Sequence, residues 1–306
     1  MADILYGDRL PPGLKKELDN LTVLRDSLWA TMIQGGTTRF AWSQYLPTKT
    51  ARNLRDFKRR WAVFNDQAHD IARQEQSQAC ILPWYDEVKN GKIEKEKLLQ
   101  TIDEMLFANL DVTMGGISWS LLFLAANEDV QEEIRQEIAQ ARSTTEATGP
   151  GWDDYIKTPS SMLAASVLES SRLAPLAAFS VPQAAPTERV VGGFLVPAGT
   201  NFIVDTHALN IRNPYWGPDG DTYRPARFLE GRKPSEMRYQ FWRFGFGPRQ
   251  CLGKYVVDLI IRTVVAQLVE GYRLRLTETT HWDKNPRTWI KHPDTEIRCD
   301  KIEKAN

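Results

Sequence analysis

The stretch that decides the fold is "FWRFGFGPRQCLGKYVVDLIIRTVVAQLVEGYRL", residues 241–274. It places one cysteine, Cys251, between a glycine-rich segment and an apolar run with helical periodicity. Three cationic side chains flank this cysteine: Arg243, Arg249 and Lys254. A cysteine at the start of a helix lies near the positive end of the helix dipole, which favours a thiolate over a thiol.

The residues around Cys251 fit two interpretations. Gly245 and Gly247 would let the backbone approach a flat ligand closely, and the guanidinium of Arg249 is a fixed donor for a carboxylate. These features suit a haem-iron ligand with an arginine that meets a propionate. A reduced core cysteine that caps a helix would explain them equally well, so the residues alone leave both interpretations open.

The composition excludes several classes of protein. The chain has 306 residues with 42% hydrophobic and 25% charged residues, which is typical of a globular protein. Its 39 basic and 39 acidic residues cancel, which argues against a general nucleic-acid binder. The three cysteines are far apart and form no CxxC pair, and the four histidines lack metal-ligand spacing. We therefore expect neither a zinc site nor a disulfide framework. We also expect the chain to reside in a reducing compartment.

The periodicity of the chain predicts a mainly α fold with a minor β-sheet, in a single domain over residues 1–306. Residues 82–93 are expected to form a loop, and residues 210–250 to be mostly irregular. Short strands are predicted within residues 188–209 and in the tail. Helices are predicted in four regions: residues 14–80, 94–141, 159–173 and from Cys251 to about Glu270.

The cysteine stretch carries a family signature. The pattern Phe244-x-x-Gly247-x-Arg249-x-Cys251-x-Gly253 resembles the haem-thiolate motif FxxGxRxCxG of the cytochrome P450 family at every specified position. The resemblance implies the cytochrome P450 fold and a bound haem b. It also implies that Cys251 is the axial ligand of the iron, that Arg249 contacts a propionate, and that Phe244, Gly247 and Gly253 belong to the same cofactor-binding loop.

Two further segments lie in the order that the resemblance requires. Glu169 and Arg172 resemble the ExxR of the family's K helix, and Arg227 in "RPARF" resembles the arginine of the PERF segment, with alanine replacing the usual glutamate. Taken alone, a Glu–Arg pair at i, i+3 is most often a surface ion pair. Its position upstream of Arg227 and Cys251 instead implies a structural core of Glu169, Arg172 and Arg227.

The third segment, residues 108–113, resembles the oxygen-binding helix of the family. It keeps the alanine and the acid, but asparagine replaces the usual glycine and valine stands where the threonine is usual. Thr113 is displaced by one residue, which is about 100° around a helix. The resemblance implies proton delivery by Asp111 and Thr113; a satisfied buried acid is the alternative for Asp111. The buried acid and the following pair of glycines also predict a local distortion of this helix.

The chain departs from the family in its N-terminal part. Asp111 follows only about a hundred residues, whereas a long N-terminal half precedes this position in the family, so we expect an N-terminally truncated P450 without the membrane anchor and first helices. We expect this chain to be soluble or peripheral, and to bind haem poorly. A full-length form would lie on the cytoplasmic face of the endoplasmic reticulum, with membrane association only through the missing part. Gln183 stands near the place of a basic residue that often meets a propionate.

The resemblance implies a haem-thiolate monooxygenase that inserts one oxygen atom from O₂ into an apolar organic substrate. Its partners would be that small substrate and a separate NADPH–cytochrome P450 reductase, with no nucleic acid. The segments "FANLDVTMGGISW" and "VPQAAPTERVVGG" resemble P450s of fungal secondary-metabolite clusters, including the epipolythiodioxopiperazine type, which suggests a diketopiperazine substrate. Two alternatives stay open: a truncated, non-catalytic relative, and a haem-thiolate enzyme that uses peroxide or rearranges its substrate.

Overall fold

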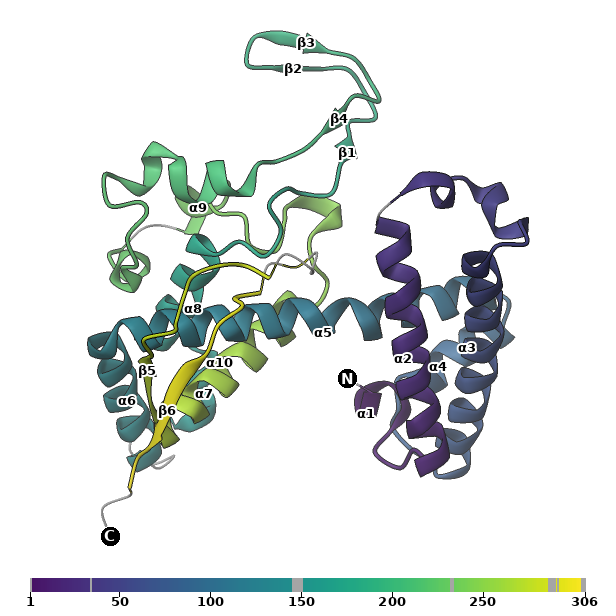
Figure 1. The fold of residues 1–306 in the computed structure, drawn as a ribbon, viewed down its shortest axis with the longest axis horizontal. Helices are drawn as coiled ribbons and strands as arrows, with labels where there is room; N and C mark the ends of the chain where they lie inside the picture. Colours follow the sequence, from purple (N-terminus) through teal and green to yellow (C-terminus); the bar gives the residue numbers. More distant parts are fainter. Residues whose placement is uncertain are drawn as a thin grey trace. The chain divides into compact units, whose positions relative to one another are not determined.

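A computed structural model of the chain describes residues 2–33, 35–144, 151–231, 234–285, 290 and 292–303. The chain divides into two compact units, Met1–Leu110 and Asp111–Asn306. The helix α5 (Lys95–Ala126) begins in the first unit and continues into the second (Figure 1). As predicted, the secondary structure is mainly helical, and the strands are few and short.

The first unit is a set of helices around an aromatic core. Trp61 stacks on Phe57 and Phe64 with ring centroids 6.0 and 5.6 Å apart, and its indole N–H donates to the Leu99 carbonyl at 2.9 Å. Thr48 caps the helix α3 (Lys49–Gln74) because its hydroxyl accepts from the amide of Ala51. Besides the start of α5, the described elements are α1 (Ala2–Tyr6), α2 (Pro12–Ile33), α3 (Lys49–Gln74), α4 (Ile81–Lys89) and the 3₁₀ turns η1 (Gly36–Arg39) and η2 (Ala41–Tyr45).

Two predicted boundaries in this part of the chain are wrong. The segment expected as a loop at 82–93 contains α4, because Ile81, Trp84, Tyr85 and Val88 form a helical stripe that packs on the core of this unit. The helix expected over 94–141 is two helices, α5 and α6 (Glu128–Ser143).

The break between α5 and α6 falls at Asn127. Its backbone lies at φ −133° and ψ 78°, outside the helical region, and its side-chain amide donates to the Phe123 carbonyl at 2.8 Å. Asparagine competes for backbone hydrogen bonds in this way, which favours helix ends over helix interiors.

The second unit is built on α6, α8 (Met162–Leu173) and α10 (Lys254–Gly271), which pack against one another (Figure 1). Their shared core includes Ile134, Val167 and Val265, all fully buried. The short helices α7 (Trp152–Lys157) and α9 (Pro234–Met237) complete the helical part. The helix predicted after Cys251 therefore forms, and it begins three residues beyond the cysteine.

The glycine pair in α5 allows close packing. A Cβ on Gly116 would lie 2.8 Å from Cδ1 of Ile261, and a Cβ on Gly115 would lie 2.9 Å from Cδ2 of Leu176. Both distances are shorter than real Cβ contacts, so a larger residue at either position would require Ile261 or Leu176 to move. The helix is continuous through Ala108–Asp111, whose side chains lie outside the described residues.

The strands of the described residues pair as antiparallel two-stranded ladders, all in the second unit. Between β4 and Cys251 the chain is mostly irregular, as predicted, with short helical turns: η3 (Ala208–Arg212), η4 (Pro214–Trp216), η5 (Pro225–Phe228) and η6 (Gly247–Arg249). The ladders join β1 (Gln183–Ala184) to β4 (Asn201–Phe202), β2 (Arg189–Val191) to β3 (Phe194–Val196), and β5 (Tyr272–Leu276) to β6 (Ile297–Lys301).

The helix α5 is also long and apolar enough to cross a membrane, by length and composition alone. Core helices of soluble proteins have the same property, and 43% of its most apolar window is buried within the protein.

Candidate functional site

A fully buried ion cluster joins α8 to the irregular segment after β4. Both Arg172 and Arg227 donate to the carboxylate of Glu169, in each case with contacts of 2.8 Å, and all three side chains are 0% exposed. Removing charges from water is costly, so such a cluster requires every donor and acceptor to be matched. The predicted i, i+3 pair and the distant arginine are thus brought together.

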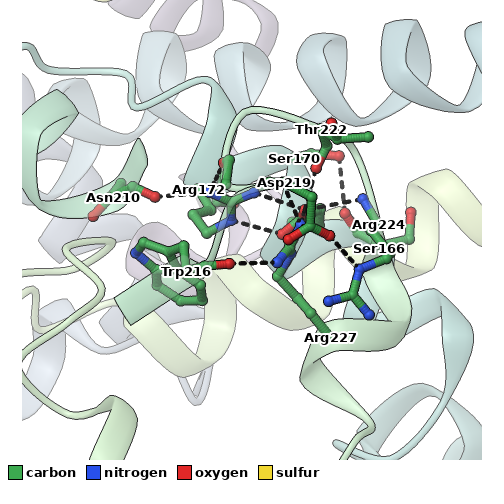
Figure 2. Close-up of polar contacts among 12 residues, drawn as sticks. Ser166, Ser170, Arg172, Asn210, Trp216, Asp219, Thr222, Arg224 and Arg227 are labelled. Carbon is green, nitrogen blue, oxygen red and sulfur yellow. Dashed lines mark hydrogen bonds and ion pairs between the residues drawn. The ribbon is translucent and has the colours of Figure 1, made fainter. Parts of the chain in front are cut away.

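Backbone carbonyls and the Asp219 carboxylate take the remaining guanidinium donors (Figure 2). Arg172 donates to the carbonyls of Asn210 at 2.8 Å and Gly220 at 2.5 Å. Arg227 donates to the carbonyls of Trp216, Asp219 and Thr222 at 2.9–3.2 Å. The cluster therefore fixes a long stretch that has little secondary structure of its own.

Asn210 links the ion cluster to the cysteine stretch by hydrogen bonds. Its side chain exchanges two hydrogen bonds with the backbone of Trp242: Nδ2 donates to the carbonyl at 2.9 Å, and Oδ1 accepts from the amide at 2.7 Å. Asn210 is 0% exposed, and its own carbonyl accepts from Arg172. Sequence reasoning missed this residue, because an asparagine in an irregular segment carries no motif or spacing that marks it as a link.

The backbone around Cys251 forms a closed loop. The amide of Cys251 donates to the carbonyl of Phe244 at 2.9 Å, and the Gln250 side chain donates to the Gly245 carbonyl at 3.0 Å. Gly245 and Gly247 lie at φ 78° and 70°, a region that favours glycine. The side chain of Cys251 is exposed and belongs to no disulfide, so its sulfur is presented outward from a loop that is fixed by its own hydrogen bonds.

The residues beside Cys251 fit a haem. Three of the side chains that follow it are apolar or aromatic yet exposed: Leu252 86%, Tyr255 73% and Val256 48%. Arg249, two residues before the cysteine, is an exposed cation. A flat apolar ring with carboxylate arms would bury the first three and pair with the last. No group of three or more acidic, histidine or cysteine side chains that could hold a metal ion occurs in the described part of the chain. A single thiolate on a haem iron requires no such group.

The remaining predicted positions are less defined. Thr113 is half-buried on α5, while the side chain of Asp111 lies outside the described residues. Gln183 is exposed at the start of β1, where it pairs with Phe202. Phe244 packs against the core that α8 and α10 share, and Gly253 lies at the cap of α10.

Comparison with known proteins gives a consistent set of relatives. The profile of the cytochrome P450 family matches residues 8–297. The chain is 51% identical to the cytochrome P450 monooxygenase aclC of Aspergillus oryzae, over 98% of this chain and 60% of that relative. It is 45% identical to asaD of Aspergillus flavus and 38% identical to gliC of Aspergillus fumigatus, both named cytochrome P450 monooxygenases, over 98% of this chain. The chain spans 57% and 58% of the lengths of these two proteins.

Proposed function

Because this chain belongs to the cytochrome P450 family, we propose that it is part of a haem-thiolate monooxygenase that inserts one oxygen atom into an apolar organic substrate. The observation that carries the proposal is the Cys251 loop, in which an exposed thiol lies on a backbone closed by the bond from its amide to Phe244. A bound haem b would supply iron that activates O₂ with electrons from NADPH, delivered by a separate reductase.

Five residues of the cysteine loop have distinct roles around that cofactor. Cys251 holds the iron as a thiolate, and Arg249 pairs with a propionate. Phe244, Gly247 and Gly253 shape the loop that presents the sulfur. Hydrogen bonds within the chain close this loop.

Proton delivery falls to α5. We assign it to Asp111, with Thr113 as a hydroxyl that holds or passes the proton. Thr113 is half-buried and displaced by one residue from the position usual in the family. This displacement is the feature that favours the alternative in which the enzyme uses peroxide, or rearranges its substrate, instead of activating O₂ with a reductase.

Glu169, Arg172 and Arg227 act structurally. All three are fully buried, the two arginines donate to backbone carbonyls, and through Asn210 the cluster fixes the segment that leads into the cysteine loop. Their role is to hold the loop in place.

The fungal relatives support a substrate from fungal secondary metabolism. The resemblance carried by the segments "FANLDVTMGGISW" and "VPQAAPTERVVGG" favours the diketopiperazine class. A full-length form would lie on the cytoplasmic face of the endoplasmic reticulum beside its NADPH–cytochrome P450 reductase, and both units would belong to one domain.

The test is oxygen incorporation by the haem-loaded chain. The chain is incubated with a cyclic dipeptide, isotope-labelled O₂, NADPH and a fungal reductase, and the products are analysed by mass spectrometry. The proposal expects a product that carries one labelled oxygen atom only when the reductase and NADPH are present. Product formed with peroxide alone would favour the peroxide-using alternative, and a chain that takes up no haem would favour the non-catalytic one.

A further inference from the structure

Arg243 lies directly before the cysteine loop and is held from two helices. Its Nη1 donates to Oδ1 of Asp258 on α10 at 2.5 Å, and its Nε donates to Oγ of Ser171 on α8 at 3.1 Å. Its guanidinium also lies 4.5 Å from the centre of the Phe244 ring. Only 11% of the side chain is exposed. The sequence motif that identifies the cysteine loop begins one residue later and does not include this arginine.

Asp258 is shared with a second arginine. Its Oδ2 lies 2.6 Å from Nη2 of Arg262, one helical turn further along α10, and Arg262 donates to the carbonyl of Thr158 at 2.7 Å. The side chains of Asp258 and Arg262 are 17% and 8% exposed. Arg243, Asp258 and Arg262, here called the loop triad, thus place two cations and one carboxylate out of most solvent.

The loop triad is costly to maintain. Burial lowers the pKa of Arg243, against the opposing effect of Asp258. Within the described residues, Nη2 of Arg243 and Nε of Arg262 are buried without a hydrogen-bond partner. Apolar side chains of similar volume often replace buried ion clusters at no loss of stability. The loop triad carries one more positive than negative charge and lies beside the Cys251 loop. We therefore attribute it to the positioning of that loop and not to a gain in the stability of the fold.

The geometry points to the loop triad as the device that positions the Cys251 loop, with Arg243 as the positioning residue. The chain of contacts is short: Arg243 is tied to α8 and α10, the next residue is Phe244, and the carbonyl of Phe244 accepts the amide of Cys251. The end of the loop enters α10, the helix that carries Asp258. Both ends of the loop are thus tied to α10.

This role is separate from that of the ion cluster on Glu169. That cluster reaches the cysteine stretch through hydrogen bonds between the Asn210 side chain and the backbone of Trp242. The loop triad contacts the cysteine stretch from α10, through the ion pair between Asp258 and Arg243, the residue after Trp242. The importance of this position for a haem ligand rests on the proposed function, whereas its control of the loop does not.

The test measures hydrogen exchange of the Cys251 amide in the full chain without haem. Arg243→Met removes all contacts of the guanidinium, so we expect this amide to exchange about tenfold faster or more, because its bond to Phe244 opens more often. The buried Leu274 amide in β5, which donates to Gln131 at 2.8 Å, should exchange at its original rate. Asp258→Asn should also accelerate exchange of the Cys251 amide. In the double variant, Arg243→Met with Asp258→Asn, the acceleration should be much smaller than the product of the two single accelerations, because both substitutions remove the same contact.

Two further variants sharpen the result. Arg142→Met removes a bidentate ion pair with Glu270 at the far end of α10, and should leave the exchange rate of the Cys251 amide unchanged. Arg243→Lys keeps the charge but loses the planar fork that reaches Ser171 and Asp258 together, so we expect an intermediate acceleration. It also provides the measurement if Arg243→Met does not fold.

A second readout uses the haem-loaded chain. Arg243→Met should increase the fraction of the reduced carbon monoxide complex that lacks the thiolate-type Soret band, with Arg142→Met unchanged. The proposal is overturned if Arg243→Met and Arg243→Lys leave the Cys251 amide at its original exchange rate, or accelerate Leu274 to the same extent. A chain that takes up no haem would count against the proposed function, while the exchange measurement would still decide the role of Arg243.

Discussion

Arg227 donates its Nε–H to Oε1 of Glu169 at 2.8 Å across 58 residues of sequence, and both side chains are fully buried. Arg227→Met should leave the Glu169 carboxylate with one arginine in place of two and lower the free energy of unfolding by about 3–5 kcal/mol. Urea unfolding followed by tryptophan fluorescence would measure this. Arg212, which is exposed and pairs with Asp205, is the matched control, and Arg212→Met should cost less than about 1 kcal/mol. Equal losses for the two variants would contradict the importance of the buried cluster.

Gly116 provides a test of close packing in α5. Gly116→Ala would bring a Cβ to 2.8 Å from Cδ1 of Ile261, so we expect a loss of about 1–3 kcal/mol although alanine is the better helix former. Ile261→Val removes that Cδ1 atom and should recover part of the loss in the Gly116→Ala background. Thermal unfolding of the two single variants and the double variant would measure the coupling.

Gly13 is the matched control for this substitution. It lies in α2, and a Cβ added there would meet nothing within 4 Å. Gly13→Ala should therefore be neutral or slightly stabilising. Destabilisation by Gly13→Ala as large as that by Gly116→Ala would show that backbone conformation, and not the contact with Ile261, limits both positions.

His207 should make stability depend on pH. Burial lowers the pKa of His207 from its ordinary value of 6.5, and the nearby Lys284 lowers it further. The unfolded chain therefore binds a proton at a higher pH than the folded chain, so stability from this group is present above pH 6.5 and is lost as the pH falls through the folded pKa. His207→Gln should flatten that part of the profile, as measured by urea unfolding at a series of pH values. An unchanged slope below pH 6.5 in this variant would show that other groups cause it.

The sequence predicted the parts of the site that are local. The spacing within residues 244–253 is a property of one loop, and Glu169 and Arg172 meet because residues at i, i+3 share a helix face. Arg227 was placed with them only through resemblance to a family, because no local rule joins residues that are 58 apart.

The parts that the sequence did not predict depend on tertiary contacts. Asn210 meets Trp242 across 32 residues of mostly irregular chain, and Arg243 meets Asp258 because the cysteine loop folds back on α10. The helix α4 was missed for a different reason: proline, asparagine and glycine in residues 82–93 resemble loop signals, but the apolar stripe packs on a core that the sequence does not show.

The most direct test of the central claim is the spectrum of the reduced, carbon monoxide-bound chain after reconstitution with haem, compared between Cys251→Ser and Cys299→Ser. Both cysteines are exposed in the structure, so the pair controls for non-specific thiol binding. Ligation by Cys251 predicts a thiolate-type Soret band in the original chain and in Cys299→Ser, and its loss in Cys251→Ser. A thiolate-type band that survives in Cys251→Ser would contradict the account.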